Sequence, residues 1–207
     1  MKFKKCNETP LGLYPVVNSY KLIKPLLVCG VTTIQLRIKT KPIYEVKEEI
    51  KEAIKISKEF KDIRLFINDY WREAIEYGAY GIHLGQEDIV NADLDAIYKA
   101  NIRLGISSHT TKEIDIALEI EPSYLAIGPI FETNSKKMSY DSVGIEDLKS
   151  WAKNVDYPIV AIGGININNI KDVLDIKSAN GIAMITGVLD SEGSVSKEKT
   201  NELLKQF

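Results

Sequence analysis

Three polar side chains alternate along one short apolar segment of the chain. Gln35, Arg37 and Lys39 lie within or just after residues 32–38, and alternate residues of a strand share one face, so Ile38 points the other way. An Arg and a Lys on one buried face repel each other unless an anion lies between them, and their donors suit phosphate oxygens. A solvated pair of surface cations is the alternative. The buried character of the segment favours a phosphate site.

Carboxylates follow the next two apolar segments. Asp69 comes directly after residues 64–68, and Asp88 belongs to the polar run 85–88. If these segments end side by side, the two carboxylates reach a common point, where each raises the pKa of the other. Mg²⁺ removes that repulsion, and it typically takes one or two carboxylates with phosphate oxygens and waters. Asp69 could instead cap the helical segment that it opens. The adjacent Asn68 and the neighbouring cations favour the metal site.

Hydroxyl groups and one of the two histidines follow the same pattern. Ser107 and His109 come at the end of residues 103–107, whereas His83 lies inside an apolar segment, where a structural role is more common. The polar stretch 131–143 is long for a loop of a compact domain, and such loops are usually functional or disordered. With its hydroxyls and lysines, this stretch suits a lid that closes over phosphate, and a plain surface excursion is the alternative.

Glycines follow the last two apolar segments. Gly163 and Gly164 precede Asn166, which opens a helix, and residues 185–187 end in Gly187. Paired glycines let main-chain N–H groups approach a ligand, and a helix N-terminus favours an anion. A Gly-Gly pair alone could equally be a turn. Two such ends in succession predict a second phosphate site.

Apolar segments and helical segments alternate along the whole chain. Near-continuous hydrophobicity is typical of strands that are covered on both faces, and the alternation predicts parallel pairing. Eight units in 207 residues predict a single-domain (β/α)8 TIM barrel over residues 1–207, whose active site lies at the carboxyl ends of its strands. The predicted strands are 11–17, 32–38, 64–68, 81–85, 103–107, 124–130, 158–163 and 181–186, and the predicted helices are 44–60, 90–100, 111–120, 145–154, 166–176 and 196–205.

Composition narrows the classes of partner and compartment. With 27 basic and 29 acidic side chains the net charge is −2, so the chain has no basic field that would attract nucleic acid. No apolar run approaches the ~18 residues of a membrane span, and no signal peptide is evident. Cys6 and Cys29 are too few for a disulfide framework. We expect a cytoplasmic protein that binds small molecules. The sequence leaves its oligomeric state open, and a homo-oligomer is compatible with it.

At these residues the chain resembles the thiamine-phosphate synthase (thiamine-phosphate pyrophosphorylase) family. The likeness covers about residues 11–190, and several stretches agree over eight or more positions. Its most specific stretches are 12–19 (GLYPVVNS), 34–39 (IQLRIK), 65–71 (LFINDYW), 80–89 (YGIHLGQEDI), 104–118 (LGISSHTTKEIDIAL), 122–138 (PSYLAIGPIFETNSKKM) and 160–165 (VAIGGI).

The resemblance implies a transfer reaction that uses Mg²⁺. The family joins 4-amino-2-methyl-5-pyrimidinylmethyl diphosphate to a (carboxy)methylthiazole ethyl phosphate, and it releases pyrophosphate. Matching positions imply that the pyrimidine diphosphate is bound by Gln35, Leu36, Arg37, Ile38, Lys39, Asn68, Ser107 and Lys136, of which Arg37, Lys39, Ser107 and Lys136 are catalytic. They imply Mg²⁺ ligands at Asp69 and Asp88, and thiazole-phosphate binding by Thr133, Asn134, Ser135, Gly164, Ile185 and Thr186.

The chain departs from the family pattern at a few positions, and two other functions stay open. Glu132 stands where the family commonly has Pro, Ser135 where it has Thr, and Thr186-Gly187 where it usually has Ser-Ala. The related thiazole tautomerase, an isomerase on the same barrel, has a proton-transferring histidine that matches His109, but it typically lacks the Asn-Asp and Gln-Glu-Asp runs present here. A non-catalytic ligand-binding relative is the second alternative, and it would be expected to lose Arg37, Asp69 or Asp88 first.

Overall fold

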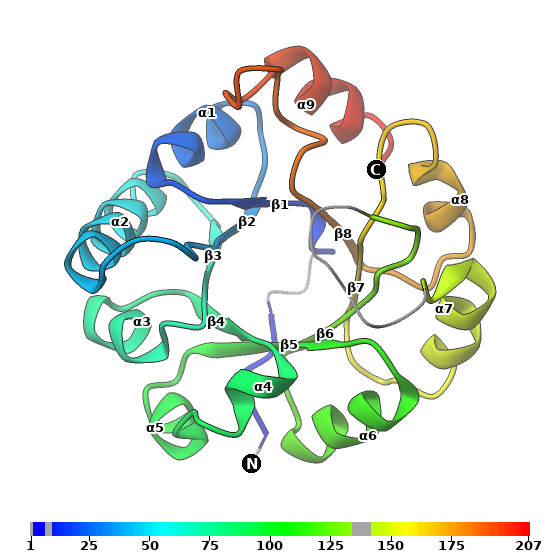
Figure 1. Cartoon of the computed structure of the whole chain (residues 1–207), viewed down its shortest axis with the longest axis horizontal. Helices are drawn as coiled ribbons and strands as arrows, with labels where there is room; N and C mark the ends of the chain where they lie inside the picture. The colour runs from blue at the N-terminus through cyan, green and yellow to red at the C-terminus, as the bar shows by residue number, and fades with distance from the viewer. Residues whose placement is uncertain (1, 7–9, 134–141) are drawn as a thin grey trace.

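Eight parallel strands close into a barrel in a computed structural model that describes residues 2–6, 10–133 and 142–207. Each strand pairs with the next one in sequence and β8 pairs with β1, so the predicted TIM barrel is confirmed (Figure 1). The predicted site residues Asn134, Ser135 and Lys136 lie outside the described residues. The strands are β1 (Gly12–Val17), β2 (Thr33–Leu36), β3 (Arg64–Asn68), β4 (Gly81–Leu84), β5 (Arg103–Ser108), β6 (Tyr124–Ile127), β7 (Ile159–Ile162) and β8 (Gly181–Met184).

Helices form an outer ring around the barrel (Figure 1). None that the structure describes is long and apolar enough to cross a membrane. The helices are η1 (Tyr20–Leu22), α1 (Ile23–Val28), α2 (Ile43–Ser57), α3 (Trp71–Tyr77), α4 (Gln86–Ile89), α5 (Leu94–Lys99), α6 (Thr111–Ile120), α7 (Gly144–Ala152), α8 (Ile170–Asp175) and α9 (Lys197–Leu204).

Several predicted elements are longer than the observed ones, for local physical reasons. The predicted strand 124–130 ends at Ile127 because Pro129 has no N–H to donate to a sheet. The predicted helix 166–176 begins only at Ile170, since the side chains of Asn166 and Asn169 bind nearby main-chain N–H groups in a turn. The helix predicted over 111–120 is confirmed to the residue, whereas α1 was not predicted.

Aromatic side chains fill the interior of the barrel. Tyr14, Phe66 and Tyr124 form the centre of this inner core, and the rings of Phe66 and Tyr124 lie 5.1 Å apart, edge to face. Gly105 on β5 makes room for them, because a Cβ atom there would lie 2.2 Å from Cζ of Tyr124. The aromatic core therefore depends on a glycine in a neighbouring strand.

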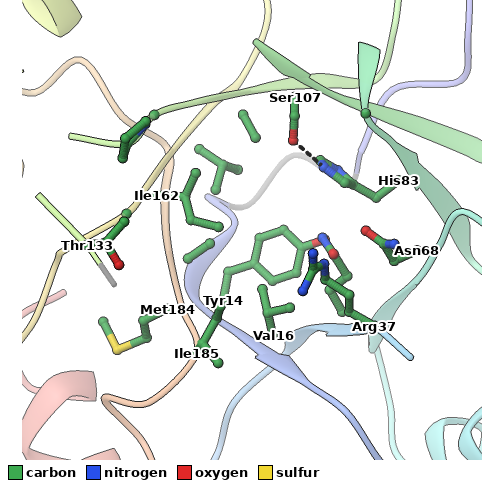
Figure 2. A pocket seen from close by; sticks show the side chains of 18 of the residues that line it. Tyr14, Val16, Arg37, Asn68, His83, Ser107, Thr133, Ile162, Met184 and Ile185 are labelled. Carbon is green, nitrogen blue, oxygen red and sulfur yellow. Dashed lines mark hydrogen bonds between the residues drawn. The ribbon is translucent and has the colours of Figure 1, made fainter. Parts of the chain in front are cut away.

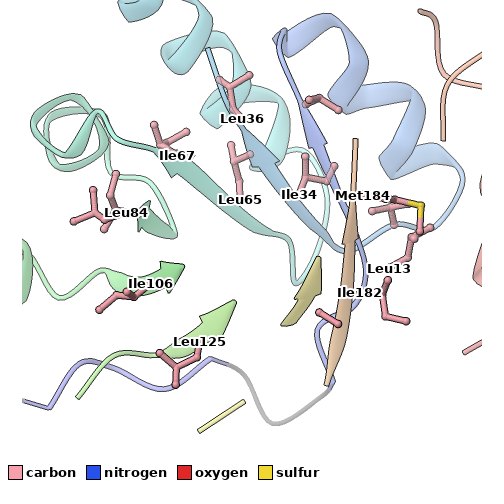
Figure 3. Close-up of a cluster of buried hydrophobic side chains, with 14 of the residues drawn as sticks. Leu13, Ile34, Leu36, Leu65, Ile67, Leu84, Ile106, Leu125, Ile182 and Met184 are labelled. Carbon is pink, nitrogen blue, oxygen red and sulfur yellow. The ribbon is translucent and has the colours of Figure 1, made fainter. Parts of the chain in front are cut away.

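Aliphatic side chains fill the layer between the barrel and the helices. Figure 3 shows Ile34, Leu36, Leu65 and Ile67 in this outer core, on the face of β2 and β3 that is turned toward the helices. Because successive strand residues alternate in direction, the residues between them point into the barrel. The outer core thus fixes which side chains of each strand face the interior.

Candidate functional site

A cavity of about 470 Å³ opens at the carboxyl ends of the strands. This volume lies within the range typical of small-molecule sites. Figure 2 shows that the ring of Tyr14 reaches into the middle of it, with Arg37, Asn68 and His83 on one side and Thr133 and Met184 on the other. The strand ends singled out in the sequence therefore meet around one space, as the barrel predicts.

The cations of the β2 end face this cavity. Gln35, Arg37 and Lys39 all line it, and the main-chain N–H of Arg37 donates to the Val17 carbonyl at 2.7 Å, which fixes the segment beside β1. Leu36 and Ile38 have 1% and 3% exposed area and lie in the outer core. Only main-chain atoms of these two residues could reach a ligand in the cavity, since their side chains point away from it.

Asp69 is held in an unusual main-chain conformation at the end of β3. Its φ of 65° is left-handed, and its N–H donates to the His83 carbonyl at 3.0 Å. The carboxylate lies 2.5 Å from the Lys39 ammonium. The structure does not show the alternative of a helix cap, because the N-cap residue that precedes α3 is Tyr70 and no side chain caps that helix. Asp69 is thus directed into the cavity rather than into the helix.

Asp88 faces Asp69 across the rim of the cavity. Burial raises the pKa of the Asp88 carboxyl, and the charge of Asp69 and a hydrogen bond with it raise that pKa further. Oδ2 of Asp88 also accepts a long bond of 3.3 Å from the N–H of Gly85. Within the described residues no group of three or more His, Cys, Asp or Glu side chains could hold a metal. The two carboxylates fit an ion such as Mg²⁺ that takes its other ligands from substrate and water.

Asn68 presents an unpartnered donor in the same region. Its side chain is 5% exposed, and within the described part of the chain its Nδ2 has no hydrogen-bond partner. Figure 2 places it between Arg37 and His83. A buried N–H that lacks an acceptor costs about 1–3 kcal/mol, so this atom marks a place where a ligand oxygen would be stabilised.

Ser107 and His83 form a hydrogen-bonded pair at the cavity wall. Nε2 of His83 lies 2.7 Å from Oγ of Ser107, and Nδ1 lies 2.7 Å from the Tyr124 hydroxyl (Figure 2). Burial lowers the pKa of His83 to about 4, so the imidazole is neutral at pH 7. Both ring nitrogens of His83 have hydrogen-bond partners, as expected for a structural residue, but the side chain also lines the cavity.

His109 directly follows β5, the strand that carries Ser107, and it also lines the cavity. Its Nδ1 lies 2.5 Å from the Gly128 carbonyl, and its main-chain N–H donates to Oε2 of Glu113 at 2.5 Å. A carbonyl can only accept, so Nδ1 carries a proton and donates to it. This bond fixes the orientation of the imidazole.

The second predicted anion site has a close-packed main chain. Phe131 N–H donates to the Gly163 carbonyl at 3.0 Å, which ties the loop after β6 to the loop after β7. A Cβ on Gly164 would lie 2.6 Å from Cβ of Phe131, and its φ of 68° is left-handed, so the position requires glycine. Thr133, Gly164, Ile185 and Thr186 all line the cavity, as does Glu132, which is exposed.

Comparisons with known proteins show the family to which the chain belongs. The family model described as thiamine monophosphate synthase matches residues 13–188. The chain is 50% identical to a thiamine-phosphate synthase of Photorhabdus laumondii over 182 residues, 87% of this chain and 83% of the relative. It is 48% identical to one of Serratia proteamaculans over 179 residues, 86% of this chain and 84% of the relative. The chain belongs to the thiamine monophosphate synthase family. The resemblance and the enzyme class predicted from the sequence are confirmed.

The structure of the chain is also similar to solved structures of other proteins. A thiamine phosphate pyrophosphorylase of Pyrococcus furiosus is 30% identical, with a TM-score of 0.81 and 95% of each chain covered. A phosphoribosyl anthranilate isomerase of Thermus thermophilus is 13% identical, with a TM-score of 0.65 and with 94% of this chain and 97% of that chain covered. The second likeness concerns the fold alone.

Sequence reasoning missed several residues that line the cavity of this family member. These residues were not among the predicted site residues because they are apolar or aromatic side chains inside predicted strands, with no chemically reactive group that singles them out. A usable signal was strand parity: Tyr14 and Val16 alternate on β1, as Gln35 and Arg37 do on β2. The missed residues include Tyr14, Val16, Tyr124, Ala126, Val160, Ile162, Ala183 and Met184.

Proposed function

We propose that this thiamine-phosphate synthase transfers the 4-amino-2-methyl-5-pyrimidinylmethyl group from its diphosphate to a (carboxy)methylthiazole ethyl phosphate and releases pyrophosphate. The observation that carries the proposal is the set of groups around one end of the cavity. Arg37 and Lys39 supply positive charge, Asn68 supplies an unpartnered buried donor, and Asp69 and Asp88 face each other beside them. This combination suits a diphosphate that is bound together with a divalent cation.

Asp69 and Asp88 would hold the cation. Burial raises the pKa of Asp88 and the charge of Asp69 raises it further, and a bound divalent cation would relieve that repulsion. Mg²⁺ bound there supplies positive charge against the oxygens of the diphosphate. Lys39, which pairs with Asp69 at 2.5 Å, lies where it would contact both the carboxylate and a phosphate oxygen.

The reaction needs no side-chain nucleophile. The C–O bond to the diphosphate breaks with both electrons leaving on oxygen, and the electron-rich aminopyrimidine stabilises the cationic carbon. The thiazole nitrogen then donates its lone pair to that carbon. Arg37, Lys39 and Ser107 are therefore proposed to stabilise the negative charge that grows on the departing oxygen. Lys136 is proposed to act with them from outside the described residues.

The thiazole phosphate is proposed to lie at the other end of the cavity. Gly164, packed against Phe131, lines this end of the cavity, and Ile185 and Thr186 offer N–H groups after β8. Thr133, with Asn134 and Ser135 beyond it, would complete the phosphate site. Binding at both ends holds the thiazole nitrogen in line with the cationic carbon, which removes much of the entropic cost of the reaction.

A coupled assay of pyrophosphate release tests this function. Purified protein receives both substrates with Mg²⁺, then each substrate alone, then both with EDTA. Release that needs both substrates and the metal supports the proposal. Tautomerisation of the carboxythiazole phosphate without release would instead favour the isomerase alternative, for which His109 lines the cavity in an orientation held by the Gly128 carbonyl. Binding of pyrophosphate without turnover would favour a non-catalytic relative.

We also propose a cytoplasmic location. Both cysteines of the chain, Cys6 and Cys29, are free thiols in the structure, which suits a reducing compartment.

A further inference from the structure

A line of hydrogen bonds crosses the barrel interior and ends at the cavity. Its members come from five different strands, and its four heavy-atom distances are 3.4, 2.9, 2.7 and 2.7 Å. In order they are Nε2 of Gln35, the hydroxyls of Tyr14 and Tyr124, the ring of His83 from Nδ1 to Nε2, and Oγ of Ser107. Figure 2 shows the last bond, from Ser107 to His83.

The first members of this line fix its direction. The amide nitrogen of Gln35 can only donate, so the oxygen of Tyr14 accepts from it. Within the described residues the Tyr14 hydroxyl has one other partner, Tyr124, so its proton is donated there. The reverse direction would leave the proton of a side chain with 1% exposed area without an acceptor, at a cost of about 1–3 kcal/mol.

The direction continues to Ser107. Tyr124 donates to Nδ1 of His83, which places the single proton of the neutral ring on Nε2, and Nε2 donates to Oγ of Ser107. Because Nδ1 accepts this bond it carries no proton, so the ring is singly protonated. Ser107 then keeps its own hydroxyl proton for an acceptor in the cavity. A diphosphate offers only acceptors.

We propose that Tyr124 and His83 are positioning residues that hold Ser107 as a hydrogen-bond donor to the diphosphate of the substrate. The proposal rests on the proposed function. The packing around Tyr124 supports this role. Gly105 leaves the space that the ring and hydroxyl of Tyr124 occupy, because a Cβ atom on Gly105 would lie 2.4 Å from the hydroxyl oxygen. Ser107 thus acts with the donors of Arg37 and Asn68, which line the same cavity.

Nitrogen NMR of the two histidine rings tests the direction without any substrate. At pH 7 we expect His83 to carry its one proton on Nε2, and we expect Nδ1 of His109 to be protonated, since it faces the Gly128 carbonyl. The variant His83→Asn assigns the two sets of signals. A proton on Nδ1 of His83, or protons on both of its nitrogens, would overturn the proposal, because Ser107 would then have to donate to the ring or face a charged one.

A double-mutant cycle tests the consequence for turnover. Tyr124→Phe removes one hydroxyl, and we expect kcat to fall about 10-fold while KM changes less than about 3-fold, because charge on the diphosphate grows as it leaves. In the Ser107→Ala background the same change should cost less than about 2-fold, since both act through one group. Tyr98→Phe is the matched control, because that ring packs on Phe3, away from the cavity. Unchanged kcat in Tyr124→Phe, or effects that multiply, would contradict the proposal.

Binding of inorganic pyrophosphate separates this proposal from the proposed function. If the wild type releases no pyrophosphate from the two substrates, the function fails, but calorimetry with pyrophosphate and Mg²⁺ still tests the role of Ser107. Tyr124→Phe and Ser107→Ala should each weaken this binding about 5-fold or more, and the double variant should bind like Ser107→Ala. Binding that is unchanged in Tyr124→Phe would overturn the positioning role.

Discussion

Among single residues, Arg37 and Lys136 give the most direct test of charge stabilisation. Arg37 lines the cavity with Asn68, and its guanidinium offers several donors to phosphate oxygens. We expect Arg37→Ala and Lys136→Ala each to lower kcat about 10²-fold or more, as does the loss of a donor that stabilises transition-state charge. Steady-state kinetics measure this. Arg72→Ala is the control, because that guanidinium lies 4.2 Å from the Trp71 ring outside the cavity. Near-normal turnover in both site variants would refute the assigned role.

Asp88 tests the metal site at the same scale. Asp88→Asn removes one of the two facing carboxylates, so the remaining site should bind Mg²⁺ less tightly. Because changes to residues around metal ligands typically cost 10- to 100-fold in affinity, we expect the half-saturating Mg²⁺ concentration to rise about 10-fold or more. Titration of activity with Mg²⁺ measures it. Asp95→Asn, on α5 and outside the cavity lining, should leave the titration unchanged. An unchanged titration in Asp88→Asn would place the metal elsewhere.

At the scale of elements, α2 ties together the loops that follow β1 and β2. Glu49 on this helix is 6% exposed, accepts from the N–H of Tyr20 at 2.7 Å and pairs with the ammonium of Lys41. Lys41 lies two residues after Lys39, so the contact restrains the segment that carries the site cation. The helix therefore contributes to the site through a buried carboxylate whose partners Tyr20 and Lys41 do not themselves line the cavity.

Glu49→Ala should weaken both the fold and this restraint. It leaves the Tyr20 N–H and the Lys41 ammonium without their acceptor, and we expect a loss of about 2 kcal/mol in the free energy of unfolding. Urea denaturation measures the loss, and KM for the pyrimidine diphosphate should rise in parallel. Glu48→Ala, whose side chain is 69% exposed, should cost less than about 0.5 kcal/mol. Equal stability of the two variants would contradict this account of α2.

For the whole molecule, much of the architecture follows from alternation in the sequence. A parallel barrel brings the carboxyl ends of its strands together at one face. The polar residues that follow the strands are therefore predicted to meet there, as Asp69 and Asp88 do. The line from Tyr14 to Ser107 could not be predicted in this way. Its bonds join residues that are 24 to 110 positions apart, so they depend on barrel closure and on the register of each strand. A helix cap at Asp69 was the more plausible role from the local sequence alone, and the structure decides against it because Tyr70 is the N-cap residue of α3 and no side chain caps that helix.

Burial of His83 in the barrel should make the stability of the whole molecule depend on pH. Its pKa is about 4 when folded and has an ordinary value of 6.5 when unfolded, so between these values the unfolded chain binds more protons. Above pH 6.5 the imidazole is neutral in both states, so its burial costs no stability through protonation. The free energy of unfolding falls as the pH drops from 6.5 toward 4. The difference between the two pKa values corresponds to a total loss of about 3 kcal/mol in the free energy of unfolding.

The comparison of wild type with His83→Asn isolates this term, because other titrating groups are common to both proteins. We expect the difference in unfolding free energy between the two to be constant from pH 7 to 8. Below pH 6.5 it should shift against the wild type, by about 3 kcal/mol near pH 4. Urea denaturation at each pH measures it. A difference that stays constant down to pH 4 would mean that the folded barrel accepts a charged imidazole. That result would be incompatible with a ring whose Nδ1 accepts from Tyr124.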